Sequence, residues 1–217
     1  MKKRLDIQKT YKLYINGKFP RTESGRYSPI HDRDGDLIAN VCRASRKDFR
    51  EAVKAARNAT SGWSSRTAYN RGQILYRTAE ILEGRKERFL EELVTMGMKK
   101  KNAEKEVDTS LDRLVYYAGW TDKYQQIFSS VNPVSSSHYN FSVPEYQGII
   151  AMIAPETNPL LGLVSLISPA IASGNTVVCL GAQQSPLSSI SFAEVLHASD
   201  VPAGVVNILT GFPSELS

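Results

Sequence analysis

Residues 148–180 read GIIAMIAPETNPLLGLVSLISPAIASGNTVVCL, and this stretch decides the fold. Its first six residues, 148–153, are continuously apolar and have the length of a strand. A helix is predicted from about Leu160 to Ala172, and residues 176–180 form a second apolar strand. Apolar strands separated by helices indicate a parallel sheet with right-handed crossovers, since helices cover both faces of such a sheet.

The same pattern repeats towards the end of the sequence. Ser185 and Pro186 suit the N-cap and the first position of a second helix. Residues 205–209 are then a third apolar strand. We therefore predict an α/β protein in which residues 148–217 form a β-α-β-α-β unit, a Rossmann-type parallel sheet that is incomplete at three strands.

The chain before this unit divides into a short extended segment and a set of helices. Asn16-Gly17 marks a tight turn in a short hairpin, and Leu37 to Cys42 reads as a strand. Ser45 with Asp48 is a capping box that starts a helix. Helical spacing then predicts four helices, with these apolar faces: Phe49, Ala52, Val53 and Ala56; Ile74, Leu75, Ala79 and Leu82; Phe89, Leu90, Leu93 and Val94; Val107, Leu111, Leu114 and Ala118.

A polar segment, residues 129–147, joins the two halves. Its first part is rich in serine and reads as a linker. Residues 139–143 alternate apolar and polar side chains, and Pro144 ends them as it would end an edge strand. We expect this edge strand to be available to a partner.

Composition and charge exclude several classes of protein. No apolar run approaches the roughly 18 residues that a membrane span needs, and the basic start, residues 1–4, does not resemble a secretory signal. The two cysteines and three histidines lack the spacing of a disulfide framework or a metal site. The net charge of +5 is spread among acidic residues, which disfavours nucleic acid as a partner. We expect a cytoplasmic protein without a metal.

Several motifs carry a resemblance to a known family. They are Leu114-Val115-Tyr116-Tyr117-Ala118-Gly119-Trp120-Thr121-Asp122-Lys123, Gly174-Asn175-Thr176-Val177-Val178 and Gly204-Val205-Val206-Asn207-Ile208, with Tyr14-Ile15-Asn16-Gly17, Gly62-Trp63, Arg71-Gly72 and Gly211 in the same order. Together they resemble the amino-terminal portion of the aldehyde dehydrogenase superfamily. The similarity covers nearly the whole chain.

The resemblance implies an NAD(P)-binding domain of Rossmann type, a catalytic domain that follows it, and a small oligomerisation extension. Residues 1–128 would be the extended segment and helices of the cofactor-binding domain, and residues 129–147 the linker with its oligomerisation strand. The implied activity is oxidation of an aldehyde to a carboxylic acid by a cysteine nucleophile and a glutamate base. In the family both groups lie beyond the end of this sequence, so we expect the chain to be inactive alone.

The loops at the carboxyl ends of the strands are the expected ligand site. The resemblance assigns the cofactor-binding positions to Ile153, Ala154, Pro155, Glu156, Leu180, Gln183 and Gly211. It also places Thr157 where the family has the asparagine that binds the oxyanion.

Three of these loops depart from the family pattern. The family's Pro-Trp-Asn-Phe-Pro corresponds to residues 155–159, PETNP, and its Lys-Pro-x-Glu corresponds to Leu180–Gln183. The last glycine of its Gly-x-Gly is replaced by Pro213. Leu180 cannot replace the charge-assisted bond of the family's lysine, and Pro213 would force its loop to be rebuilt, so we expect NAD or NADP to bind weakly or not at all. Thr157 could still donate to an oxyanion, but its side chain is shorter than that of asparagine.

Three functions remain open from the sequence. The chain is part of an active aldehyde dehydrogenase whose catalytic domain lies elsewhere, or it is a non-catalytic scaffold that pairs with a complete aldehyde dehydrogenase. A nucleic-acid-binding module rests on charge alone, because Tyr116, Tyr117 and Trp120 lie in an apolar helical pattern that favours core packing over base stacking.

Overall fold

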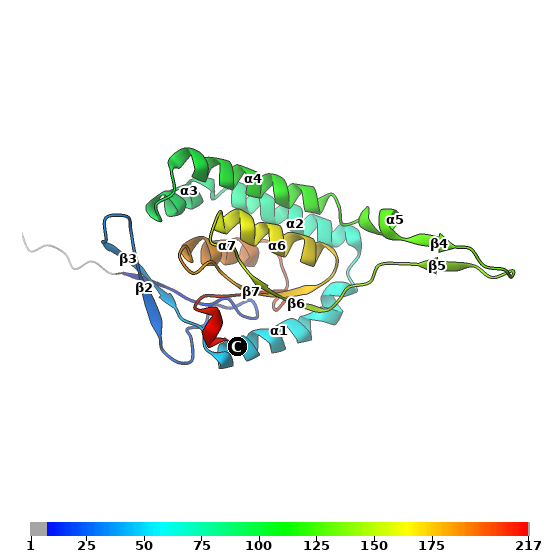
Figure 1. Ribbon diagram of the computed structural model, residues 1–217, viewed down its shortest axis with the longest axis horizontal. Helices are drawn as coiled ribbons and strands as arrows, with labels where there is room; N and C mark the ends of the chain where they lie inside the picture. Colours follow the sequence, from blue (N-terminus) through cyan, green and yellow to red (C-terminus); the bar gives the residue numbers. More distant parts are fainter. Residues whose placement is uncertain (1–7, 217) are drawn as a thin grey trace, which may run out of the picture.

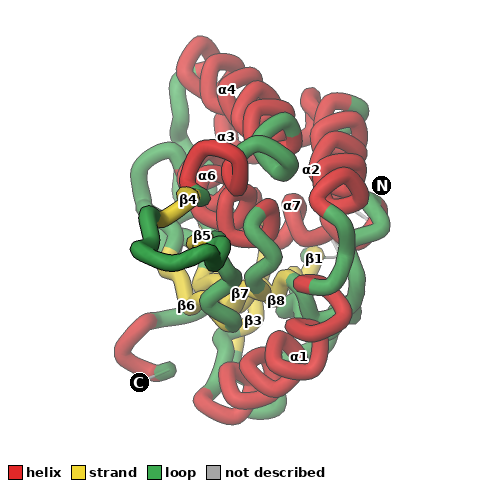
Figure 2. Tube along the Cα trace, turned by 90° about the vertical axis from the view of Figure 1, so that its right-hand side faces the viewer, coloured by secondary structure: helices red, strands yellow, loops and turns green. Residues whose placement is uncertain are grey.

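The computed structural model describes residues 8–216, so the basic residues 1–4 lie outside its description. A small parallel sheet forms the centre of the molecule (Figures 1 and 2). Helix α1 (Arg46–Ser64) packs on one face of it. Helices α6 (Pro159–Ala172) and α7 (Leu187–Ala198) cover the other face, and α2 (Ala68–Glu83), α3 (Lys86–Thr95) and α4 (Lys100–Ala118) lie outside them.

The central sheet has the predicted β-α-β-α-β connection. Strands β6 (Ile149–Ile153), β7 (Thr176–Leu180) and β8 (Val206–Leu209) are parallel and stand in the order β6-β7-β8. β7 is buried along its whole length, whereas β6 is an edge strand and Ile153 is 64% exposed. The fold class predicted from the sequence is therefore confirmed, although the full apolar run of β6 is not matched by full burial.

Helix α7 begins one residue later than predicted. Pro186, expected at the first helical position, is the N-cap, and the carbonyl oxygen of Ser185 accepts a hydrogen bond from the Ser188 hydroxyl at 3.3 Å. A proline is tolerated there because the first residues of a helix need no intrahelical N–H donor.

The amino-terminal segment forms a second sheet that adjoins the first. Strands β1 (Lys9–Tyr11), β2 (Tyr27–His31) and β3 (Leu37–Cys42) stand in the order β1-β3-β2, and β2 was not predicted because its exposed residues lack a clear apolar pattern. The expected tight turn is present at Asn16-Gly17, where both residues have positive φ. Its hairpin is limited to the pair Ile15 and Lys18.

The helices of residues 45–118 bury most of the predicted apolar faces, but Val94 is 39% exposed. Ser45 and Asp48 form the predicted capping box of α1. The helical residues Leu75, Leu82, Phe89, Leu93, Val107 and Leu114 are among those buried in the main core. A short helix, α5 (Tyr124–Phe128), follows α4.

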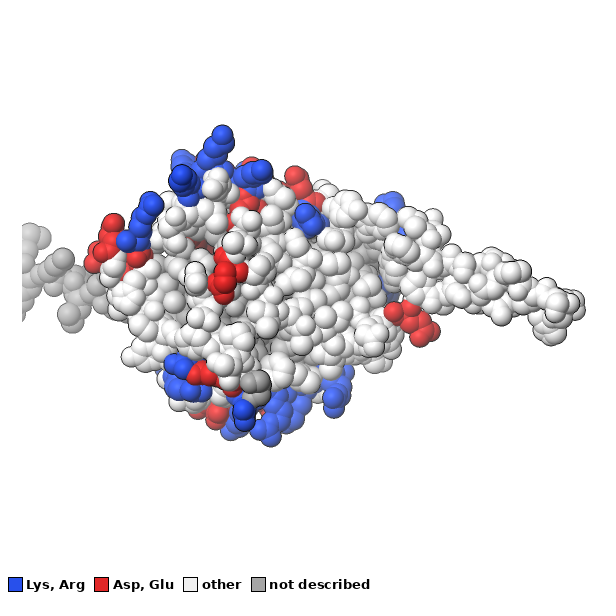
Figure 3. Space-filling view, in the orientation of Figure 1, with Lys and Arg blue, Asp and Glu red and all other residues white. Residues whose placement is uncertain are grey.

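Residues 129–143 form a separate hairpin that stands out from the body of the molecule (Figure 1). Strand β5 (Asn140–Ser142) lies inside the predicted edge strand, but it pairs with β4 (Ser130–Asn132), which the sequence analysis placed in the linker. Tyr139 is 74% exposed and Phe141 is 58% exposed. Figure 3 shows no Lys, Arg, Asp or Glu along the hairpin.

The expectation that Tyr116, Tyr117 and Trp120 pack in the core is wrong. Tyr116 is 54% exposed, and Tyr117 and Trp120 are partly exposed. The end of α4 reaches past the core, so these rings line an open groove of about 290 Å³ whose other walls are α5 and the end of α6. Aromatic residues at helical spacing marked an apolar face, but not whether another element covers it.

Charge and hydropathy add two findings. Figure 3 shows Lys and Arg, with Asp and Glu among them, over the helices at the top of the view and around α1 at the bottom rather than gathered in one stripe. No helix among the described residues is long and apolar enough to cross a bilayer.

Candidate functional site

The loops after β6, β7 and β8 meet at one edge of the sheet. The N–H of Ala154 donates to the carbonyl oxygen of Leu180 at 2.8 Å, and that of Gly181 donates to Leu209 at 2.8 Å. These bonds continue the strand ladder into the loops. The structure therefore brings the loop residues assigned from the sequence to the carboxyl ends of the strands, where an open α/β sheet binds ligands.

A buried carboxylate of α4 binds the first turn of α6, directly after the β6–α6 loop. Glu106 of α4 is 2% exposed, and its Oε1 accepts hydrogen bonds from the N–H groups of Leu160 and Leu161 at 2.8 and 3.1 Å. These are orphan donors in the first turn of α6, and Asn158 at the N-cap supplies no side-chain bond. Burial raises the pKa of the Glu106 carboxyl, and the two amides offset part of that rise. The sequence analysis missed this residue.

Thr157 lies exposed on the loop, and its hydroxyl forms no hydrogen bond within residues 8–216. Asn158, one place along, has a φ of 50°, in the left-handed region. Moving Asn158 into the position of Thr157 would require a change of backbone conformation. Pro155 contacts Gly162 of α6 so closely that no side chain fits there.

Glu156 connects two of the loops. Its carboxylate accepts hydrogen bonds from the N–H of Gln183 at 2.8 Å and from the N–H of Gln184 at 2.9 Å. The side chain is exposed, and these two bonds tie it to the next loop.

Ile153 and Leu180 line an apolar cavity of about 320 Å³ on the α1 face of the sheet. Leu180 is 6% exposed and offers no polar group, as its side chain implied. The sequence analysis did not assign Phe49 or Leu216 to this site. Only the packing of α1 and the chain end against the sheet shows that they share it.

Gln183 and Gly211 line a second cavity of about 190 Å³, between the loops and the amino-terminal sheet. Gly211 has a φ of 141°, and a Cβ at this position would lie 3.2 Å from the amide nitrogen of Ala44. Arg43 forms an ion pair with Glu215 and stacks on Phe212, so this part of the chain is anchored to the end of β3.

The motifs that carried the resemblance are mainly structural joints. Arg71 is buried, and its Nε donates to the carbonyl oxygen of Ala172 at 3.0 Å at the end of α6. Trp63 donates from its indole nitrogen to the carbonyl oxygen of Ile171 at 3.0 Å. Asn175 accepts the N–H groups of Gln147 and Gly148 at the start of β6. These contacts position the sheet rather than a ligand.

Both cysteines are buried free thiols. Cys179 lies inside β7, and burial raises its pKa to about 12. A thiol with so high a pKa is almost entirely protonated near neutral pH and is a poor nucleophile.

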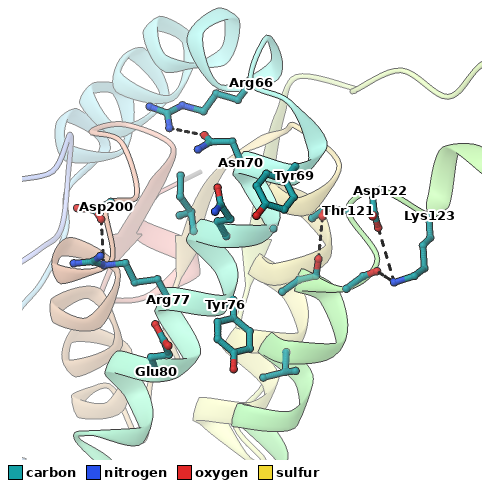
Figure 4. A pocket seen from close by; sticks show the side chains of 16 residues that line it. Arg66, Tyr69, Asn70, Tyr76, Arg77, Glu80, Thr121, Asp122, Lys123 and Asp200 are labelled. Carbon is teal, nitrogen blue, oxygen red and sulfur yellow. Dashed lines mark hydrogen bonds and ion pairs between the residues drawn. The ribbon is translucent and has the colours of Figure 1, made fainter.

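A larger cavity, of about 780 Å³, lies away from the carboxyl ends of the strands and is open to solvent (Figure 4). It runs between α2 and the end of α4, and its lining includes Asp200, which precedes β8. Arg77 points to Asp200 at 3.1 Å, and Arg66 points to Asn70 at 2.8 Å. This cavity is separate from the crevice formed by the loops at the carboxyl ends of β6, β7 and β8, because it opens on the side of the amino ends of the strands.

Comparison with known proteins places the chain in a family. The family model described as aldehyde dehydrogenase family matches residues 19–217. The putative aldehyde dehydrogenase DhaS of Bacillus subtilis is 33% identical over 98% of this chain and 44% of its own length. Retinal dehydrogenase 2 of Gallus gallus is 34% identical over 96% of this chain and 40% of its own length.

Solved structures agree with these relatives. The NAD+ complex of an aldehyde dehydrogenase from Bacillus cereus superposes with a TM-score of 0.91 at 30% identity, covering 96% of this chain and 43% of that one. The chain thus spans less than half the length of these relatives, and it corresponds to their amino-terminal portion. On the matching family model and these relatives together, this chain belongs to the aldehyde dehydrogenase family.

Proposed function

We propose that this chain is the amino-terminal part of an NAD(P)-dependent enzyme that oxidises an aldehyde to a carboxylic acid. The observation that supports it best is the meeting of the β6, β7 and β8 loops at one sheet edge in a chain of this family. Residues 1–128 and 148–217 would build the first part of the cofactor-binding domain, and the protein would be cytoplasmic.

The crevice fits a nucleotide only in part. The apolar cavity lined by Ile153 and Leu180 would hold a flat, apolar part of the nucleotide. The polar groups of the nucleotide would be bordered by Ala154, Pro155, Glu156, Gln183 and Gly211. Two features oppose tight binding. Leu180 supplies no charge, and Glu156 already occupies two amides of the neighbouring loop. We therefore propose that NAD or NADP binds weakly or not at all.

The cofactor, when bound, accepts a hydride from the substrate. The side chains of these residues would orient it and exclude water, but they supply no nucleophile. Cys42 and Cys179 are buried. Thr157 would stand at the position of the asparagine that binds the oxyanion in the family. For this reason we propose that residues 1–217 do not oxidise aldehydes by themselves.

Titration calorimetry of the folded chain with NAD and with NADP tests this proposal. We expect weak or undetectable heat with both dinucleotides. A low-micromolar dissociation constant for either would contradict weak binding. Aldehyde-dependent NADH formation by the isolated chain would contradict its inactivity.

A second function, scaffolding of a complete aldehyde dehydrogenase, is favoured by the hairpin of β4 and β5. Its exposed residues Val131, Tyr139, Phe141 and Val143 form an uncharged surface that a monomer would leave in water. We propose that this hairpin pairs with another copy or with a complete relative.

The substitution Phe141→Pro places a residue without a backbone N–H in the centre of β5 and should abolish this association. Ser136→Pro, at the tip between the two strands, is the matched control and should leave it intact. Light scattering measures self-association, and pull-down of a purified complete aldehyde dehydrogenase measures pairing. Association that survives Phe141→Pro would rule out the hairpin as the interface.

A further inference from the structure

The contact between Glu156 and the β7–α7 loop carries an inference that rests on the proposed nucleotide crevice and refines it. Glu156 leaves the loop after β6, and its two carboxylate oxygens each accept one N–H, from Gln183 and from Gln184. A pair of adjacent backbone N–H groups facing one carboxylate is a small anion-binding concavity. In this chain its occupant comes from the protein itself.

The Glu156 carboxylate opposes the binding of other anions at these two amides. Among residues 8–216, these two amides are the hydrogen-bonding partners of Glu156, and no cation pairs with it. The Glu156 side chain therefore lies at the carboxyl ends of β6 and β7 without a cationic partner among the described residues. An incoming phosphate would lose the two amides to Glu156 and would also meet a like charge.

Glu156 departs from the family pattern quoted above. That pattern, Pro-Trp-Asn-Phe-Pro, has tryptophan at the place of Glu156. The contact is also solvent-exposed on both sides, since Glu156, Gln183 and Gln184 are exposed. An exposed contact of this kind can be displaced without disturbing the core.

We propose that Glu156 is an internal competitor that determines which ligands the crevice accepts. While its carboxylate lies on the amides of Gln183 and Gln184, that part of the crevice rejects phosphate groups. When the carboxylate is absent, the same two amides bind a phosphate oxygen.

Glu156→Ala and Glu156→Gln test this with inorganic pyrophosphate as the probe. Nuclear magnetic resonance follows the amide signals of Gln183 and Gln184 at constant ionic strength. We expect saturable shifts of both signals in Glu156→Ala, with an affinity roughly five- to tenfold tighter than in the wild type. Glu156→Gln, which keeps the side-chain length but removes the charge, should fall between them.

Glu145→Ala is the control, because Glu145 is exposed, forms no hydrogen bond or ion pair within the described chain, and its loss changes the net charge equally. It should behave like the wild type. Equal responses of wild type and Glu156→Ala, or no response in either, would overturn the proposal.

Calorimetry of the same proteins with NAD and NADP separates this inference from the proposed function. Pyrophosphate binding at the two amides of Glu156→Ala supports the competition whether or not either dinucleotide binds. A low-micromolar dissociation constant of the wild type for NAD or NADP would contradict the proposed weak binding and would leave the competition to be decided by pyrophosphate alone.

Discussion

The side-chain amide of Asn207 joins two segments that are 191 residues apart, because its Oδ1 accepts the N–H of Asn16 at 3.0 Å. Its Nδ2 donates to the carbonyl oxygens of Val177 at 3.2 Å and Gly204 at 2.9 Å. Asn207 is fully buried within β8. One side chain thus holds the Asn16-Gly17 turn against the edge of the central sheet.

Asn207→Ala should lower the free energy of unfolding by about 1–3 kcal/mol, because it leaves buried backbone groups without partners. Urea denaturation followed by circular dichroism measures the change. Asn58→Ala, at an exposed position of α1, is the control and should change stability by less than about 0.5 kcal/mol. A loss no larger than in the control would mean that water satisfies these groups.

Glu106 should make stability depend on pH. Burial raises the pKa of its carboxyl in the folded state above the unfolded value of about 4.3. Such a group binds its proton more tightly when folded. Its favourable contribution is therefore complete below the unfolded pKa and is lost as the pH rises through the folded pKa.

Glu106→Gln keeps an acceptor for the amides of Leu160 and Leu161 but cannot ionise. We expect the stability of Glu106→Gln relative to wild type to increase as the pH rises from about 4.5 to about 7. Urea denaturation at several pH values gives this difference. A difference that does not vary with pH would exclude Glu106 as the titrating group.

Arg71 should contribute more to the free energy of unfolding than the exposed Arg77 on the same helix, α2. The guanidinium of Arg71 donates to three carbonyl oxygens. They belong to Ala172 at the end of α6, Ser64 at the end of α1, and Arg66 just after α1. Arg71→Lys cannot reproduce this fork, so we expect a loss of about 2–4 kcal/mol.

The matched control is Arg77→Lys. Arg77 lies on α2 like Arg71, but its guanidinium forms an exposed ion pair with Asp200. It should cost no more than about 1 kcal/mol. Thermal and urea denaturation compare the two variants. Equal losses would show that the buried contacts of Arg71 add nothing beyond a surface ion pair.

Cys179 should not react in the folded protein. Burial raises its pKa to about 12, so little thiolate exists at pH 8, and the side chain is fully buried. We expect no alkylation of Cys179 or Cys42 by iodoacetamide at about pH 8 until urea unfolds the chain. Mass spectrometry locates the label. Rapid alkylation of native Cys179 would show that β7 opens.

The strong periodic signals predicted most of the fold. Apolar runs predicted β6, β7 and β8, and the Ser45 capping box predicted the start of α1, because both depend on local sequence. The exposed strand β2 and the pairing partner of β5 were missed, since their residues carry no apolar alternation and pair with distant segments.

The site was predicted less completely. Loop positions such as Glu156 and Gln183 followed from strand ends and from the family motif, but nothing in the sequence indicated that these two residues touch. Glu106 was missed for the same reason, because it lies 54 residues from Leu160. Tyr116 was misplaced because helical spacing identifies a face without identifying what covers it.

The sequence by itself determined the family and the β-α-β-α-β order of its second half. The tertiary structure alone decided that Glu156 occupies the amides of the next loop, that Glu106 holds the start of α6, and that the hairpin stands away from the body. Local chemistry sets which element a segment forms. Contacts between segments depend on how those elements pack, and this is where charge, burial and exposure are assigned.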